Sequence, residues 1–254
     1  MSNISDFVII NTSILRRYNG KDCHVVIPDG VTTISKNTFA KCNNLVSIQL
    51  PIGVTHIGEN AFTACTNLTS VILPESLTNI GEGAFSHCRN LTSITVPDSV
   101  KSIDGYAFYG CSNLSNINIP LGVTSIAEGV FADCVSLSSI NIPRGVISIG
   151  ESAFDRCKSL TTITIPDGIA TLGNEAFREC ENLTSIIIPS SVTSIGDEAF
   201  VFCESLTNIT FLGDILNIGD EAFCECDNLT INAPRGSYVE KYAEKNDIPF
   251  KAID

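Results

Sequence analysis

Positive charge is scarce in this sequence. It contains 15 lysine and arginine residues against 28 aspartate and glutamate residues, so the formal net charge is 15 − 28 = −13 at pH 7. A protein of this charge repels the phosphate backbone of nucleic acids and the anionic surface of lipid bilayers. We therefore expect no nucleic-acid partner.

Long apolar runs are also missing. No stretch approaches the roughly 20 apolar residues that a transmembrane helix needs. The first residues, MSNISDFVII, lack the basic start and the long apolar run of a secretory signal. We expect no membrane insertion, and the chain as written is expected to be cytoplasmic.

Residue sets that support catalysis are absent from the sequence. The three histidines, His24, His56 and His87, lie in unrelated places and form neither a catalytic triad nor a metal-binding pattern. The chain contains neither a P-loop nor a GxGxxG motif. The sequence predicts no enzyme, no cofactor and no metal site.

A repeat of 23 residues dominates what is present. The stretch IGEGAFSHCRNLTSITVP, which begins at Ile80, returns in related form from Ile57, Ile149 and Ile195. One cysteine marks each repeat, at Cys42, Cys65, Cys88, Cys111, Cys134, Cys157, Cys180, Cys203 and Cys226. A phenylalanine precedes each of these cysteines by three residues, and a leucine follows it by three. Nine units in register predict a solenoid, in which one supersecondary unit stacks on copies of itself.

Two segments of each unit alternate as strands do. In the first segment, for example residues 160–166, Ile163 and Ile165 alternate with threonines, and such alternation of β-branched residues predicts a strand. Proline ends this segment in most units, because it cannot donate to a strand ladder. The second segment, for example residues 192–196, alternates in the same way. The pattern predicts two parallel sheets along the solenoid.

The rest of the unit holds the Ala-Phe-x-x-Cys motif. Ala199, Phe200 and Cys203 follow an i, i+1, i+4 pattern, which predicts one turn of α- or 3₁₀-helix with Phe and Cys facing inward. Acidic residues precede most of these turns, and we interpret them as a solvated edge because no Asp-rich calcium loop accompanies them. The periodic cysteines are too far apart in sequence for a zinc knuckle, so we expect reduced, buried thiols.

Both ends depart from the repeat and are expected to cap it. Residues 1–30 read as a hairpin of short strands, and residues 231–254 contain a predicted helix over 238–245 and a final apolar strand. Such covers are needed because an end coil would expose its core and its strand edges. Residues 31–230 form the repeat region, on the order of 45 Å long at about 4.8 Å between neighbouring strands.

The repeat resembles a known family. The core Leu91-x-x-Ile94-x-Val96 is that of leucine-rich repeats, and the form IGxxAFxxCxxLTSIxIP is similar to BspA-like (Treponema pallidum type) leucine-rich repeat proteins. The resemblance covers about residues 20–230, and the ends resemble caps of such proteins. It implies a single α/β, mostly β, domain: a right-handed leucine-rich-repeat solenoid of about nine coils with N- and C-terminal caps. It also implies display on a microbial cell surface and a role in binding, including adhesion.

Two functions follow from these expectations. The first is a non-catalytic scaffold for protein–protein or protein–glycan recognition, which we expect to be a monomer. The alternative is a structural protein that self-assembles through its repeats. The resemblance implies that a ligand binds the concave sheet, where the outward position between the two inward isoleucines forms a row: Gln49, Ile72, Thr95, Asn118, Asn141, Thr164, Ile187 and Thr210. The same row also suits an ordinary exposed strand. A rival patch consists of large residues at turn positions: Tyr106, Tyr109, Val201 and Phe202.

Overall fold

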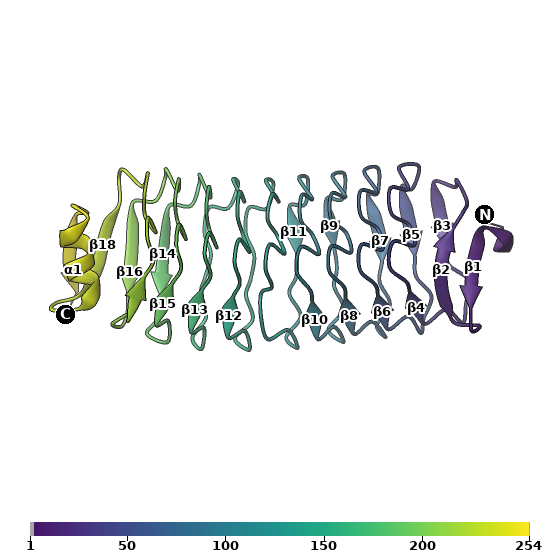
Figure 1. Ribbon diagram of the computed structural model, residues 1–254, viewed down its shortest axis with the longest axis horizontal. Coiled ribbons are helices and arrows are strands. Elements are labelled where there is room, and N and C mark those ends of the chain that lie inside the picture. Colours follow the sequence, from purple (N-terminus) through teal and green to yellow (C-terminus); the bar gives the residue numbers. More distant parts are fainter. Residues whose placement is uncertain (1–2, 254) are drawn as a thin grey trace.

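The computed structural model describes residues 3–253 as an elongated stack of coils with the two chain ends at opposite ends of the stack (Figure 1). The chain starts with a short 3₁₀-helix, η1 (Ile4–Asp6), followed by the antiparallel hairpin of β1 (Phe7–Ile10) and β2 (Ile14–Tyr18). Asn11 and Thr12 form its turn with positive φ angles of 48° and 63°, which suit the twist of a tight hairpin.

The first segments of the repeats lie along one long side of the stack as parallel strands. They are β3 (His24–Val26), β5 (Ser47–Gln49), β7 (Ser70–Ile72), β9 (Ser93–Ile94), β11 (Asn116–Ile117), β14 (Ser185–Ile188), β16 (Asn208–Phe211) and β18 (Thr230–Pro234). Residues 23 apart face each other, as Ser47 and Ser70 do. The hydrogen-bonded pairing is broken between β7 and β9, and from β11 to β14 only the single bridges Asn141–Thr164 and Thr162–Ser185 occur. The predicted sheet is therefore present in three pieces.

The second segments form another parallel sheet side. They are β4 (Thr33–Ile34), β6 (His56–Ile57), β8 (Asn79–Ile80) and β10 (Ser102–Ile103), which extend the sheet from β2, and then β12 (Ser148–Ile149), β13 (Thr171–Leu172), β15 (Ser194–Ile195) and β17 (Asn217–Ile218). A single bridge from Ile126 to Ile149 precedes β12, and no pairing joins β10 to Ile126 within residues 3–253. Two parallel sheet sides are confirmed, but neither is continuous.

Successive turns, not a helix, form the third side, so the predicted helical turn is wrong. Two residues of each repeat adopt the left-handed conformation, as Asn60 and Ala64 do with φ of 53° and 55°. Alternate N–H groups consequently point to the next coil, whereas a helix would bond them within the coil. The Phe62 N–H donates to the Ala84 carbonyl at 2.7 Å, and two neighbouring N–H groups do the same. This turn ladder, three bonds per junction, runs through all eight junctions between the nine repeats.

A column of phenylalanine rings fills the core behind the turn ladder. From Phe39 to Phe223 neighbouring rings stack with centroids 5.1–6.0 Å apart and interplanar angles of 4–20°. Tyr18 closes the column at the N-terminal end, where its ring centroid lies 5.0 Å from that of Phe39. At the other end Tyr242 meets Phe223 edge-on at 6.0 Å. Burial of large aromatic surface in every coil makes this column a main contributor to stability.

The repeat cysteines lie beside this column. Eight of the nine are buried, and Cys42 is half-buried, so the predicted inward placement of cysteine is confirmed for eight coils. Each buried thiol donates to the phenylalanine carbonyl of the preceding coil at 3.0–3.3 Å, as Cys65 does to Phe39. The cysteines therefore join coils by weak hydrogen bonds as well as by packing.

A glycine sets the distance between coils at the end of the second strand. A Cβ built on Gly173 would lie 2.5 Å from the Glu151 nitrogen in the preceding coil, a distance that real atoms do not adopt. In each repeat that has this glycine, its N–H donates to the carbonyl of a leucine or isoleucine in the preceding coil at 2.8–2.9 Å. Asp104 and Ala127 occupy this position in successive coils, and they form the one junction where both coils carry a Cβ. Ala127 is also the one residue at this position whose N–H has no partner among residues 3–253, which explains the break after β10.

The C-terminal end is covered by α1 (Tyr238–Lys245) and β19 (Phe250–Ile253). The Ser237 side chain accepts a hydrogen bond from the Glu240 N–H at 3.2 Å and so caps the helix, whose predicted range is confirmed. Strand β19 adds to β18 as a parallel strand, and it begins at Phe250, two residues later than the predicted apolar segment at Ile248.

Candidate binding surfaces

The outward side chains of the first strands form a surface that we call the first-strand face. The predicted row lies on it: Gln49, Ile72, Thr95, Asn118, Asn141, Thr164 and Ile187 are exposed, and Thr210 is half-buried. Register places row residues beside one another, as Gln49 lies beside Ile72 and Ile187 beside Thr210. Ile72 and Ile187 are each 56% exposed, so two apolar side chains interrupt the polar row.

Most polar groups in the row are unused by the protein itself. Among the described residues, the side chains of Gln49, Thr95, Asn141 and Thr164 make no hydrogen bond to another protein group. Such side chains can donate to or accept from a ligand without breaking internal bonds.

Asn118 differs from the other row residues. Its side-chain carbonyl accepts from the Val96 N–H at 2.8 Å, and its amide donates to the Val96 carbonyl at 2.7 Å. The side chain thus replaces backbone bonds at the point where the pairing of β9 and β11 ends. Asn118 therefore joins two coils, and its side-chain oxygen and amide are already engaged within the protein.

The first-strand face carries no charge over its central length. The column beside the row consists of serine, threonine and asparagine at Ser47, Ser70, Ser93, Asn116, Ser139, Thr162, Ser185 and Asn208. From Ser47 to Thr210 neither column contains a charged residue, although the whole protein has a formal charge of −13. Most of the charge therefore lies elsewhere, and this face suits hydrogen bonding and shape more than electrostatic attraction.

The turn side carries a cluster of rings. Tyr106 and Tyr109, both in the predicted rival patch, have ring centroids 6.1 Å apart at 89°. The ring centroid of His87, which that predicted patch did not include, lies 4.9 Å from that of Tyr109. The Tyr106 hydroxyl donates to Glu128, and this hydrogen bond raises the pKa of Tyr106 to about 12. A Cβ built on Gly110 would lie 2.5 Å from the His87 ring, so the glycine makes room for the ring cluster.

The other half of the predicted rival patch does not join this cluster. Val201 is only 4% exposed, whereas Cys224, at the same position of the next repeat, is exposed. Phe202 is 41% exposed and lies four repeats from Tyr109, beside a cleft of about 330 Å³ that Glu204 and Glu225 also line. The prediction of one patch that includes Val201 is therefore wrong.

A charged network on the turn side was missed by the sequence analysis. Arg156 approaches Glu179 at 3.2 Å and Lys158 approaches Glu181 at 2.6 Å. Both pairs join residues 23 apart, so opposite charges at the repeat spacing were the available signal. Asp155 lies among these groups, and burial raises its pKa to about 6, although the nearby Arg156 opposes the rise.

The exposed cysteines lie near the two ends of the solenoid. Burial raises the pKa of Cys65 to about 12 and that of Cys88 well above its usual value, which leaves little of the reactive thiolate. Cys23 and Cys224 are the exposed cysteines of the described chain. Within residues 3–253 no three His, Cys, Asp or Glu side chains are placed to hold a metal ion. Nor does that part of the chain contain a helix with the length and hydropathy needed to cross a bilayer.

Comparison with known proteins gives matches along almost the whole chain. A family model for the BspA type leucine rich repeat region matches residues 18–138 and 124–246, with six copies of the repeat. A leucine rich cell surface protein from Faecalibacterium prausnitzii A2-165 is 26% identical with a TM-score of 0.59, over 98% of this chain and 93% of that one. A leucine-rich repeat protein from Bacteroides ovatus ATCC 8483 is 29% identical with a TM-score of 0.51, over 90% and 77% of the two chains.

A more distant likeness concerns the fold alone. The pneumococcal vaccine antigen PcpA is 16% identical with a TM-score of 0.55, over 91% of this chain and 79% of that one. No curated protein matches the chain.

Proposed function

This chain belongs to the BspA-type leucine-rich repeat family, and from that membership we propose that it is a non-catalytic scaffold that binds a protein ligand along the first-strand face. The observation that carries the proposal is the uncharged, exposed row, whose polar side chains are mostly unused within the protein. An extended parallel array of this kind offers a ligand many equivalent hydrogen-bonding positions.

We also propose display at a cell surface, in a role that includes adhesion. The Faecalibacterium relative is described as a cell surface protein, and it matches 98% of this chain. Protease treatment of intact cells should release peptides of this protein if it is displayed. Release only after lysis would contradict this location.

The test of binding begins with protein and glycan arrays probed with the whole chain. A protein ligand that binds one-to-one is expected, whereas concentration-dependent oligomers without ligand would support the self-assembly alternative. Hits confined to glycans would change the proposed class of ligand.

Two paired variants then locate the site. Thr95→Arg with Thr164→Arg adds two charges to the first-strand face, and should weaken binding by at least about tenfold, or about 1.4 kcal/mol. Thr124→Arg with Ala170→Arg adds the same charges to exposed positions in the second segments of two repeats and serves as the control. Binding that survives the first pair but is lost in Tyr106→Ala or Phe202→Ala would move the site to the turn side.

A further inference from the structure

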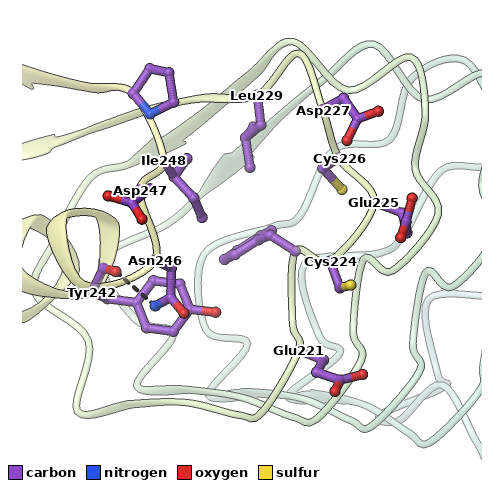
Figure 2. A pocket seen from close by; sticks show the side chains of 12 residues that line it. Glu221, Cys224, Glu225, Cys226, Asp227, Leu229, Tyr242, Asn246, Asp247 and Ile248 are labelled. Atoms are coloured by element: carbon purple, nitrogen blue, oxygen red, sulfur yellow. Dashed lines mark hydrogen bonds between the residues drawn. The ribbon is translucent and has the colours of Figure 1, made fainter.

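The last coil leaves a cleft beside the C-terminal cap. Its volume is about 460 Å³, and it lies between the final turn segment and the link from α1 to β19. Figure 2 shows Glu221, Cys224, Glu225 and Asp227 on one side, and Tyr242 and Asp247 on the other. The Tyr242 ring covers the Phe223 ring, so the apolar column is closed while the edge of the turn segment borders the cleft.

The turn ladder is unfinished at this edge. In the preceding coil the N–H groups of Glu198, Phe200 and Phe202 donate to the final coil at 2.9, 2.8 and 3.1 Å. The equivalent groups of the final coil belong to Glu221, Phe223 and Glu225, and among residues 3–253 none of the three has a hydrogen-bond partner. The repeat geometry directs them away from the stack, towards the cleft. Unpaired backbone donors in a row form an edge that another backbone can extend.

Charge defines what can extend this edge. The final turn segment, 219–229, carries Asp220, Glu221, Glu225 and Asp227 and no basic residue, a formal charge of −4. Asp247 lines the opposite wall, and no Lys or Arg is among the residues that line the cleft. The N–H donors require carbonyl oxygens, and the carboxylates disfavour an anion and favour positively charged side chains.

A second copy of the chain fits this edge poorly. The matching acceptors would be carbonyls of its first turn segment, including that of Thr38. The Thr38 carbonyl already accepts from the Tyr18 N–H at 3.3 Å, and the Tyr18 ring packs against Phe39. The N-terminal hairpin thus occupies the surface that head-to-tail stacking would need.

We propose that this C-terminal cleft binds a basic peptide segment of a partner protein, whose backbone carbonyls accept from the N–H groups of Glu221, Phe223 and Glu225. Its Lys or Arg side chains pair with the surrounding carboxylates. The site is separate from the first-strand face, so it holds or fails independently of the function proposed above.

The probe for this site is a synthetic peptide with the sequence of residues 35–45 and Cys42→Ser. Lys36 and Lys41 give it a formal charge of +2, and it has the turn pattern that the ladder normally pairs with. The comparison peptide has the sequence of residues 219–229, with both cysteines changed to serine and a formal charge of −4. Both peptides are capped at their ends and are added to the whole chain.

Two readouts report on the edge itself. Amide hydrogen exchange of Glu221, Phe223 and Glu225 should slow at least about tenfold with saturating basic peptide, because a bonded N–H exchanges only on opening. The exposed Cys224 should be alkylated several-fold more slowly, while Cys23, exposed at the other end, should react as before. The acidic peptide should change neither readout.

A charge-reversed pair supplies the matched variant. Lysine already occupies the positions equivalent to Glu225 and Asp227 in other repeats, at Lys41 and Lys158, so Glu225→Lys with Asp227→Lys should fold normally. It should abolish protection by the basic peptide, whereas Glu82→Lys with Glu151→Lys makes the same change at distant exposed positions and should preserve it.

Three results would overturn the proposal. They are no protection at millimolar basic peptide, equal protection by the acidic peptide, and protection of the same amides without peptide that rises with protein concentration. The last result would assign the edge to a second copy of the chain.

Discussion

The glycine at the end of the second segment of most repeats allows a direct test of what sets the distance between neighbouring coils. Gly173 and Gly196 occupy the same position in successive coils, and a Cβ on either would fall inside van der Waals contact with the backbone of the coil before it. The natural junction of Asp104 with Ala127 has a Cβ in both coils and lacks the hydrogen bond. We predict that Gly173→Ala with Gly196→Ala recreates that break.

The magnitude follows from three contributions. Each single substitution overpacks a close contact at a cost of about 1–3 kcal/mol. The loss of unfolded-state freedom returns about 0.4–1 kcal/mol, which leaves a net loss of about 1–2 kcal/mol. The Asp104 N–H keeps its hydrogen bond to the Ile80 carbonyl at 2.9 Å, although Asp104 carries a Cβ, and the equivalent residue of the preceding coil is Gly81. The bond should therefore survive when only one of the two coils carries a Cβ. The double variant should also lose the Gly196 bond to Leu172, worth about 1 kcal/mol beyond the sum of the singles.

Two measurements check this reasoning. Denaturant unfolding of the single and double variants gives the coupling free energy, and amide exchange at position 196 reports the bond directly. Gly145→Ala is the control, because its Cβ would meet only the Leu121 carbonyl at an ordinary 3.5 Å. Effects that add within about 0.5 kcal/mol, together with an amide at 196 that stays protected, would refute the account of the break after β10.

Three further predictions follow from the turn side and the cap. Burial raises the folded-state pKa of Asp155 to about 6, so the folded state binds the proton of this carboxyl more tightly than the unfolded state does. The resulting contribution to the free energy of unfolding is present in full below pH 4 and is lost as the pH rises through 6. Asp155→Asn should therefore stabilise the protein by about 1 kcal/mol at pH 7, after solvent screening, and not at pH 3.5. Cys157→Ala should lower the unfolding free energy by about 1–2 kcal/mol, since it removes buried sulfur and a donor to the Phe131 carbonyl, and an unchanged denaturation midpoint would contradict this. Deletion of residues 235–254 should uncover Phe223 and cause aggregation, and a soluble monomer with unchanged melting would show that the cap is dispensable.

The sequence predicts the repeat-level fold well because the period itself carries the information. Alternation predicts the strand β14, whose inward Ile186 and Ile188 are buried, whereas the segment with the buried Ile163 and Ile165 forms only single bridges. The spacing of phenylalanine and cysteine predicts their inward stacking. The helix over 238–245 follows from local signals, with Ser237 as its cap. These features depend on residues within one coil or one segment.

Features that depend on contacts between coils were harder to predict. The i, i+3 spacing of Phe200 with Cys203 suits a helix as well as a chain of turns, and only the left-handed residues such as Glu198 decide between them. Glutamate at such a position gives no clear local signal, because left-handed backbone usually favours glycine or asparagine.

The candidate site shows the same division between local and inter-coil information. Alternation alone places the predicted row on an exposed face. It does not show that Asn118 binds the Val96 backbone, because that contact arises where strand pairing ends. Opposite charges at the 23-residue spacing, as in Lys158 and Glu181, would have indicated the turn-side network.

The continuity of the turn ladder gives the two strand sides freedom to vary. At the junction that includes Ala127 the strand bonds are lost, yet the turn bonds from Tyr106, Phe108 and Gly110 remain at 2.8, 3.0 and 2.8 Å. Phenylalanine and cysteine occupy their turn positions in all nine repeats, whereas the first-strand row ranges from glutamine to isoleucine. Because the turn side fixes the register of the stack, the first-strand face can change residue by residue without loss of the fold, which is the property that a ligand-binding face of a repeat protein requires.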